Sequence, residues 1–263
     1  MPSRIWSISQ AADSERLLNE KDVQASTVLH PGTSKTARKI LFEVMMTGNA
    51  GDFCVLLKED SHVLHFVALT FKENLLRLFE AARLGSVEAL LEMLAGDPLI
   101  LERVPLAQDT PLHVAVLAGK AEFAKEILRQ RPRYALELNK DGFSPIHIAS
   151  INGDIELVRE LLKVDSSLCS LKDRDGRTPI HLASMKGRLD VMGELLSACL
   201  ESAREVTVQG ETILHLVVKS NQFEAFKVLV ERAPFHDILN AKDQDGNTIL
   251  HLAVCRKQIQ VAL

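Results

Sequence analysis

Five histidines are the first residues in this sequence whose type and spacing suggest chemistry. His113, His147, His181 and His215 follow one another at intervals of 34 residues, and His251 comes 36 residues after the last of them. Imidazoles bind zinc and transfer protons near neutral pH. Equivalent positions in stacked helical units lie about 8 to 10 Å apart, whereas zinc ligands lie about 2 Å from one centre. The interval therefore argues against a shared ion, and we expect no metal site.

A structural role explains these histidines better than catalysis does. Each stands three residues after a Thr or Ser, as in the segment from Thr178 to His181. Thr and Ser cap helices through their side-chain oxygen, so each histidine would occupy the third position of a helix. We expect each ring to hydrogen-bond the capping residue and the backbone of the neighbouring turn.

The four cysteines show no spacing that is typical of a metal or redox site. Cys54, Cys169, Cys199 and Cys255 lie far apart, and no C-x-x-C pair occurs. The sequence therefore predicts reduced, buried thiols in a cytosolic protein. It also contains no phosphate-binding loop, nucleophile elbow or zinc-peptidase motif. We expect no cofactor and no enzymatic activity.

The composition restricts the class of partner. The chain has 263 residues and a formal charge of −4, and 46% of its residues are hydrophobic, which is enough for a continuous core. Lys and Arg are scattered among Asp and Glu, so a nucleic-acid partner is not expected. No stretch of about 18 consecutive apolar residues occurs, so we expect no membrane span. The N-terminus lacks a secretory signal, and a cytoplasmic location is predicted.

The elements that position the histidines repeat with the same period. Each Thr or Ser is followed by Pro or Ile, which suits the first helical position, and a Gly or Asn closes that short helix. A second helix follows, with apolar residues at helical spacing such as Ile155, Val158 and Leu161. Asp-Gly or Gln-Gly then reverses the chain before the next unit.

This pattern resembles the ankyrin repeat: T-P-L-H-x-A, a glycine at the helix end and an Asp-Gly turn. The resemblance covers residues 109 to 263 clearly, and 78–85 extends it backwards. It implies an all-α solenoid of helix-turn-helix units joined by short β-hairpin turns. The segments 97–101, 123–128 and 239–243 are similar to plant defence-signalling ankyrin proteins of the PGG-domain family, and the transmembrane PGG part itself is missing from the sequence.

The period divides the chain into units. A shift of 37 residues aligns Leu41 and Phe42 with Leu78 and Phe79, which suggests a degenerate repeat upstream of the clear ones. The last unit holds only part of a repeat, so we expect a shortened product, an excised segment or a splice variant, with a frayed C-terminus. The expected segments are a polar, disordered leader at 1–38, a degenerate repeat at 39–75, ankyrin repeats at 76–108, 109–142, 143–176, 177–210 and 211–246, and a truncated repeat at 247–263.

The resemblance also implies where a partner binds. Ankyrin proteins generally bind partners on a concave surface made of turn tips and first helices, at positions that the motif leaves free. Phe143, Ile151 and Met185 would supply apolar anchors there. The cluster from Lys172 to Asp175 is interpreted as a solvated fingertip, that is, the tip of a hairpin turn, and not as a charge relay. The predicted partner-binding residues are Lys140, Phe143, Ile151, Asn152, Arg174, Arg177, Met185, Lys186, Gln209, Glu211, Lys219, Gln244 and Asn247.

The sequence therefore predicts a monomeric, non-enzymatic scaffold or adaptor that binds protein partners in plant immune or stress signalling. One alternative is the cytosolic segment of a membrane-tethered signalling or transport-regulating protein whose transmembrane C-terminus is missing here. A second alternative is an enzyme or ligand-binding module within residues 1–75.

Overall fold

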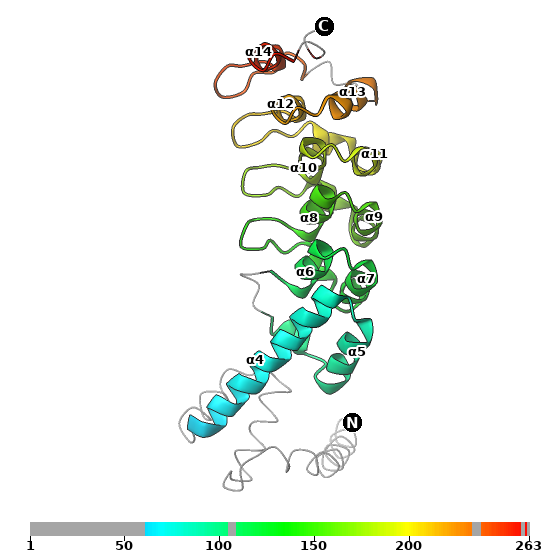
Figure 1. Ribbon diagram of the computed structural model, residues 1–263, viewed down its shortest axis with the longest axis vertical. Coiled ribbons are helices and arrows are strands. Elements are labelled where there is room, and N and C mark those ends of the chain that lie inside the picture. The colour runs from blue at the N-terminus through cyan, green and yellow to red at the C-terminus, as the bar shows by residue number, and fades with distance from the viewer. Residues whose placement is uncertain (1–60, 105–108, 233–237, 259–260, 262–263) are drawn as a thin grey trace, which may run out of the picture. The chain divides into compact units, whose positions relative to one another are not determined.

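The computed structural model describes residues 61–104, 109–232, 238–258 and 261 (Figure 1). The predicted leader at 1–38 and residues 39–60 of the predicted degenerate repeat lie outside the described residues. The chain divides into two compact units, 1–72 and 73–263. Helix α4, Ser61–Leu84, is continuous across that division and across the boundary that the period sets after residue 75.

Residues 73–263 form a stack of helix pairs. The first helices of successive pairs contact one another, and so do the second helices, from α6 at one end to α14 at the other (Figure 1). No strand occurs in the described part of the chain, which confirms the predicted all-α solenoid. The first or inner helices are α6 (Pro111–Leu117), α8 (Pro145–Asn152), α10 (Pro179–Met185), α12 (Ile213–Lys219) and α14 (Ile249–Cys255). The second or outer helices are α5 (Val87–Gly96), α7 (Ala121–Gln130), α9 (Ile155–Val164), α11 (Leu189–Ala198) and α13 (Phe223–Arg232).

Short 3₁₀ turns connect the outer helices to the next unit. Four lie within the described residues, namely η1 (Ile100–Glu102), η2 (Pro132–Ala135), η3 (Ser166–Ser170) and η4 (Leu200–Ala203). The hairpin turns follow them. Asn139 accepts from the Gly142 N–H at 2.9 Å and donates to the Phe143 carbonyl at 2.9 Å, which closes one such hairpin.

Capping residues determine where the inner helices begin and end. Ser144 and His147 form a reciprocal capping box at the start of α8, and the same box occurs in α6, α10, α12 and α14. The far end of α8 is closed by Gly153 at φ 84°, a left-handed conformation that glycine adopts without steric cost. Asn221 and Lys257 adopt the same conformation at the equivalent points after α12 and α14. The helix ends predicted from the sequence are confirmed.

The core of each unit is completed by the next unit in the stack. Ile146 in α8 and Ile180 in α10 are fully buried between neighbouring pairs. Leu250 holds the equivalent position in α14 and is 53% exposed. The stability of a unit therefore depends on its neighbours, as it does in other solenoids.

Two buried hydroxyls lack partners, and their removal is expected to stabilise the fold. Ser150 and Ser184 lie at the same position of α8 and α10, and neither Oγ has a hydrogen-bond partner. Val116 and Val218 occupy that position in α6 and α12, so the site accepts an apolar side chain. An unsatisfied buried hydroxyl costs about 1 kcal/mol or more. We expect Ser184→Ala to raise the free energy of unfolding in urea by about 1 kcal/mol, and a decrease would contradict this account.

Candidate protein-binding surface

Each buried histidine joins its own helix to the next hairpin turn. The backbone N–H of Ser144 donates to His147 Nδ1 at 3.2 Å, and the Ser144 Oγ lies 2.7 Å from the same nitrogen. Because Nδ1 accepts, the ring proton resides on Nε2, which donates to the Arg177 carbonyl at 3.2 Å. The ring therefore acts as a rigid strut between consecutive units.

The same strut recurs along the stack. The Nε2 of His113 donates to Phe143 O at 3.0 Å, and that of His181 to Glu205 O at 3.1 Å. Further along, Nε2 of His215 donates to the Asn247 carbonyl at 3.0 Å. The hydrogen bonds predicted for these histidines are confirmed.

Burial disfavours the charged form of three of these histidines. Desolvation lowers the pKa of His147 and of His181 to about 4, against an ordinary value of 6.5, and it also lowers the pKa of His113. Both ring nitrogens of His147 are engaged, so neither offers a lone pair to a metal ion. The part of the chain that the structure describes contains no group of three or more His, Cys, Asp or Glu residues arranged to hold one.

The hairpin tips, which we call fingers (139–143, 173–177, 207–211 and 243–247), are held by their first residue. Asp173 Oδ1 accepts from the backbone N–H groups of Asp175 at 2.9 Å and Arg177 at 2.8 Å. Asn139 and Asp243 close their own fingers in the same way. Each finger is therefore a preformed loop.

Neighbouring fingers are also joined to one another. The Val208 N–H donates to the Asp175 carbonyl at 2.8 Å, and the Gln244 N–H donates to Gln209 O at 3.0 Å. The aliphatic stem of Arg174 lies against Gly142, where an added Cβ would be only 2.4 Å from Arg174 Cγ. The four fingers thus form one continuous edge.

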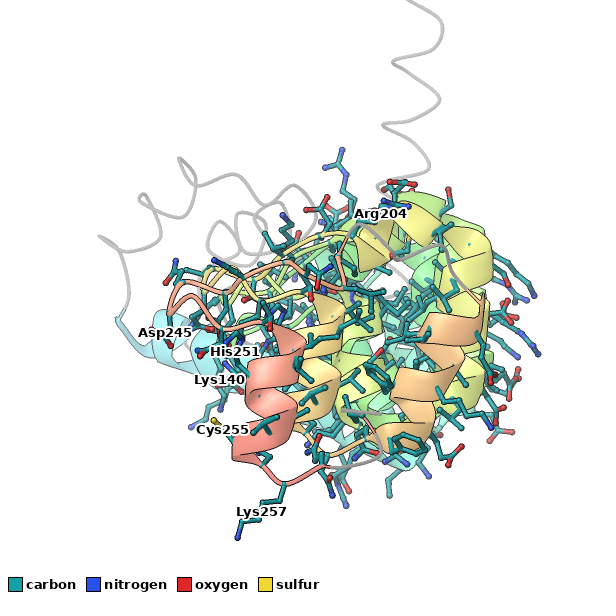
Figure 2. All side chains as sticks on the ribbon, turned by 90° about the horizontal axis from the view of Figure 1, so that it is seen from above. Lys140, Arg204, Asp245, His251, Cys255 and Lys257 are labelled. Carbon is teal, nitrogen blue, oxygen red and sulfur yellow. The ribbon has the colours of Figure 1, made fainter. Side chains whose placement is uncertain are left out.

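The fingers and the exposed ends of the inner helices (151–152, 185–186 and 219–220) together make what we call the fingertip face. In Figure 2, Lys140 and Asp245 lie on the side of the inner helices away from the outer helix α13. Most of the predicted partner-binding residues are accessible on this face. Exposed are Lys140, Asn152, Arg174, Lys186, Gln209 and Gln244, and half-buried are Phe143, Ile151, Arg177, Met185, Lys219 and Asn247.

At three of the predicted partner-binding positions, the side chain is bound to another residue of the chain and is not available to a partner. Glu211 is buried, with a carboxylate oxygen against Lys219 Nζ, so it is not the exposed finger residue that the sequence predicted. Arg177 turns back onto Asp173, with Nε 2.8 Å from Oδ2. Asn247 contacts Asp243 in its own finger. The cause in each case is a hydrogen-bonding partner that the sequence pattern does not place: the Lys219 ammonium for Glu211, and a finger carboxylate for Arg177 and Asn247.

The interpretation of Lys172 to Asp175 as a solvated fingertip is wrong for one residue. The side chain of Asp173 is only 1% exposed. It turns inward because it accepts three hydrogen bonds, two from the backbone and one from Arg177. Arg174, in contrast, is exposed.

The ammonium of Lys219 is expected to be required for stability. It contacts Glu211 and lies 3.6 Å from Asp243 Oδ2, and these two carboxylates are 9% and 2% exposed. Lys219→Met would leave both carboxylates without their cation, at a cost of about 2 kcal/mol in the free energy of unfolding. Lys186→Met, at an exposed neighbouring position, should change it by less than about 0.5 kcal/mol. Equal effects of the two substitutions in urea denaturation would contradict the assignment.

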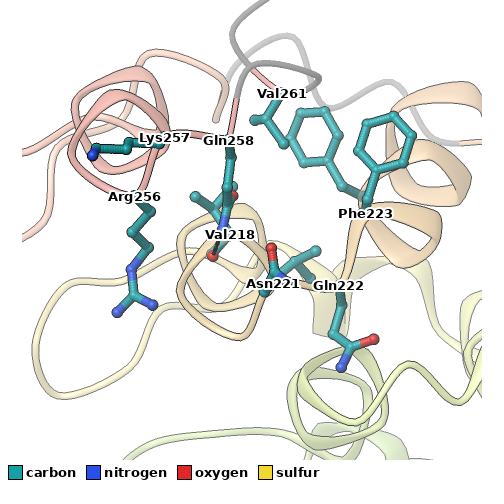
Figure 3. A pocket seen from close by; sticks show the side chains of 10 residues that line it. Val218, Asn221, Gln222, Phe223, Arg256, Lys257, Gln258 and Val261 are labelled. Atoms are coloured by element: carbon teal, nitrogen blue, oxygen red, sulfur yellow. Dashed lines mark hydrogen bonds between the residues drawn. The ribbon is translucent and has the colours of Figure 1, made fainter.

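One hollow, with a volume of about 340 Å³, lies between α12, α13 and α14. Phe223 and Val261 face each other on one side of it, whereas Arg256 and Lys257 point away on the other (Figure 3). Gln258 crosses it and donates to Val218 O at 2.9 Å. Its lining contains no carboxylate, histidine, cysteine or hydroxyl side chain.

Comparison with known proteins agrees with this geometry. A family model for ankyrin repeats in three copies matches residues 78–168, 112–203 and 194–263. The chain belongs to the ankyrin repeat family. This ankyrin protein is 50% identical over 187 residues to the ankyrin repeat-containing protein BDA1 of Arabidopsis thaliana. The match covers 67% of the chain and 44% of that relative, so the chain spans less than half of the relative's length.

Family membership indicates that this ankyrin protein contacts other proteins, because ankyrin repeats are interaction modules. The longest described helix, α4, has 24 residues. Neither it nor any other helix among the described residues combines the length and the apolar character needed to cross a membrane. The resemblance predicted from the T-P-L-H pattern is confirmed.

Proposed function

We propose that this ankyrin protein is a non-enzymatic, monomeric scaffold or adaptor that binds a protein partner on its fingertip face. The observation that carries this proposal is the continuous edge made by the linked fingers. Because the backbone bonds from Val208 to Asp175 and from Gln244 to Gln209 fix the fingers before binding, little ordering is required when a partner docks.

The uncommitted side chains on this edge would supply specificity. Lys140, Arg174 and Lys186 are exposed, and none forms an ion pair with another described residue. Met185 is half-buried beside Lys186 and offers an apolar contact. A partner with acidic groups flanking an apolar side chain would complement this arrangement.

Plant immune or stress signalling is the proposed setting. It is supported by the 50% identity to BDA1 of Arabidopsis and by the similarity of the repeat sequence to plant defence-signalling ankyrin proteins. A cytoplasmic location and the absence of a nucleic-acid partner belong to the same proposal. They are supported by the balanced charge of the chain, with 31 basic and 35 acidic residues.

Photo-cross-linking tests the surface directly. A photoreactive amino acid would replace Arg174 or Lys186 on the fingertip face, and Arg129 or Lys163 on the outer helices, before incubation in plant extract. We expect one protein of the same mass to be captured from both fingertip positions and not from the outer helices. Capture from the outer helices alone would place the binding site elsewhere.

A matched pair of triple variants measures affinity once the captured protein is known. Lys140→Ala, Arg174→Ala and Lys186→Ala together should weaken binding by about tenfold or more, equivalent to about 1.4 kcal/mol. Arg129→Ala, Arg159→Ala and Lys163→Ala remove the same charge from the outer helices and should leave the affinity unchanged. Equal losses in both triple variants would indicate a general charge effect.

The alternative proposal is that the chain acts as the cytosolic segment of a membrane-tethered signalling or transport-regulating protein. It is supported by the chain spanning only 44% of the length of BDA1. An antibody against residues 143–210 would test it on fractionated tissue. A longer polypeptide in the membrane fraction supports this alternative, and a single band of about 29 kDa in the soluble fraction contradicts it.

A further inference from the structure

Two cysteines from consecutive units lie together on the side of the stack where the outer helices lead into the fingers. Cys169 lies in η3, and Cys199 precedes η4 by one residue. The Oγ of Ser170 lies 3.8 Å from Cys169 Sγ and 3.5 Å from Cys199 Sγ. The two sulfurs therefore lie around the same hydroxyl group. Both are free thiols in the structure.

The pair is peculiar to these two units of the stack. Ala135 and Ala203 hold the position of Cys169 in the flanking units, and they are buried as Cys169 is. Arg131 and Asp165 hold the position of Cys199 in the two preceding units. A cysteine is therefore not needed at either position for the units to stack, so packing alone does not explain why two sulfurs lie around Ser170 Oγ.

We propose that Cys169 and Cys199 form a peroxide-sensitive pair that closes into a disulfide and covalently links two adjacent repeats. This inference concerns a site apart from the fingertip face and does not rest on the proposed function. The class of oxidant is hydrogen peroxide or an organic hydroperoxide.

The surroundings of the two sulfurs assign different roles to them. Cys199 is half-buried, and its sulfur lies 3.5 Å from Ser170 Oγ. The hydrogen bond with Ser170 lowers the pKa of the Cys199 thiol. Cys169 is buried, and its thiol donates to the Ser166 carbonyl at 2.9 Å. Burial raises the pKa of Cys169 to about 11. The thiolate forms at Cys199, so Cys199 is the residue that attacks the peroxide.

The reaction balances in two steps. The Cys199 thiolate attacks hydrogen peroxide, a sulfur–oxygen bond forms as the oxygen–oxygen bond breaks, and sulfenic acid and hydroxide result. The Cys169 sulfur then attacks the sulfenic sulfur. The sulfur–sulfur bond forms, and the hydroxyl leaves as water with the Cys169 proton. Each sulfur has lost one electron, and the peroxide has gained two.

The bond would constrain the stack locally. Lys172 and Glu205 pair at 2.7 Å just beyond η3 and η4, and they lead into the fingers that carry Arg174 and Gln209. A disulfide between η3 and η4 would therefore fix the spacing of these two fingers. Closing a loop of about 30 residues is expected to raise Tm by about 5 to 10 °C.

The test uses the full chain carrying Cys54→Ser and Cys255→Ser, which leaves only the proposed pair. Mild hydrogen peroxide should remove about 2 Da from the intact mass, and a reductant should restore it. Non-reducing digestion should release one cross-linked peptide pair containing Cys169 and Cys199. In concentrated guanidinium chloride the same oxidation should be at least about tenfold slower, because the native contact is lost.

Single substitutions separate the two roles. Cys169→Ala copies the residue of the flanking units and should leave a sulfenic acid on Cys199 that dimedone traps, with no loss of 2 Da. Ser170→Ala, at an exposed position, should slow the oxidation severalfold without changing the fold. Overoxidation of Cys199 with no internal disulfide, a disulfide between two chains, or equal rates in the native and denatured chain would each overturn the proposal.

Discussion

Acidification from pH 7.5 to about 4.5 should lower the free energy of unfolding by about 5 kcal/mol, through His147 and His181 alone. The pKa of each is about 4 in the folded chain because the ring is buried, whereas an unfolded histidine titrates near 6.5. The unfolded state therefore binds protons between these values and the folded state does not. The contribution of these two histidines to the free energy of unfolding is fully present above about pH 6.5. It falls as the pH is lowered through this window and is lost below about pH 4.

Urea denaturation at a series of pH values measures this effect, and histidine variants locate it. Each buried ring contributes a slope of about 1.4 kcal/mol per pH unit inside the window. His147→Gln or His181→Gln should lose that amount of slope, whatever the variant does to stability at pH 7.5. Carboxylates such as Asp243, whose pKa is lowered in the fold, act only below the ordinary range of an aspartate. An unchanged slope in both variants would refute the neutral-strut account.

Asp173→Ala is expected to cost about 3 kcal/mol, the largest effect of any single finger substitution. The carboxylate accepts two backbone N–H groups at 2.8 and 2.9 Å and the Arg177 guanidinium at 2.8 Å, and it is almost fully buried. Removing it leaves these three donors without their acceptor. The finger would then lose its fixed shape, together with the bond from its Asp175 carbonyl to Val208.

Two matched variants make the Asp173 prediction specific. Asp173→Asn keeps the oxygen that closes the finger, as Asn139 does in the preceding finger, and should cost only about 1 kcal/mol. Asp141→Ala removes an exposed finger carboxylate and should stay within about 0.5 kcal/mol of the parent. Hydrogen exchange at Asp175 and Arg177 should accelerate in Asp173→Ala alone. Unchanged protection there would show that the side chain does not hold the finger.

The repeat architecture could be predicted from the sequence because its determinants are local. A Thr or Ser, a Pro and a His within four residues specify a capping box, and the box appears in α6, α8 and α10 as expected. The left-handed helix ends at Gly153 and Asn221 follow from residue type alone. The continuity of α4 past residue 75 was not predicted, because the boundary there was set by the repeat period and not by a helix-ending residue.

The side chains of the candidate surface were predictable only in part, because their orientation depends on the adjacent unit. Glu211 is drawn inward by Lys219, which lies eight residues later on α12. Arg177 is drawn back by Asp173. Cys169 and Cys199 come from two units and lie around the Ser170 hydroxyl, and a search for C-x-x-C spacing cannot detect this arrangement. The period of the motif predicts where the backbone of each unit lies. The contacts between side chains depend instead on which residues of adjacent elements come together when the units stack.

The histidine struts donate to main-chain carbonyls, and this explains how a protein of this kind can change its partner without losing its fold. Each Nε2 donates to a backbone carbonyl, and the residues that provide it are Phe143, Arg177, Glu205 and Asn247. These four residues have unrelated side chains, and each accepts the same hydrogen bond because only its main-chain carbonyl takes part. Mutation can therefore change the half-buried side chain of Phe143 without removing the hydrogen bond that its carbonyl accepts from His113. Substitutions of surface side chains therefore leave the hydrogen bonds between units in place, so that recognition of partners can change while the fold is kept.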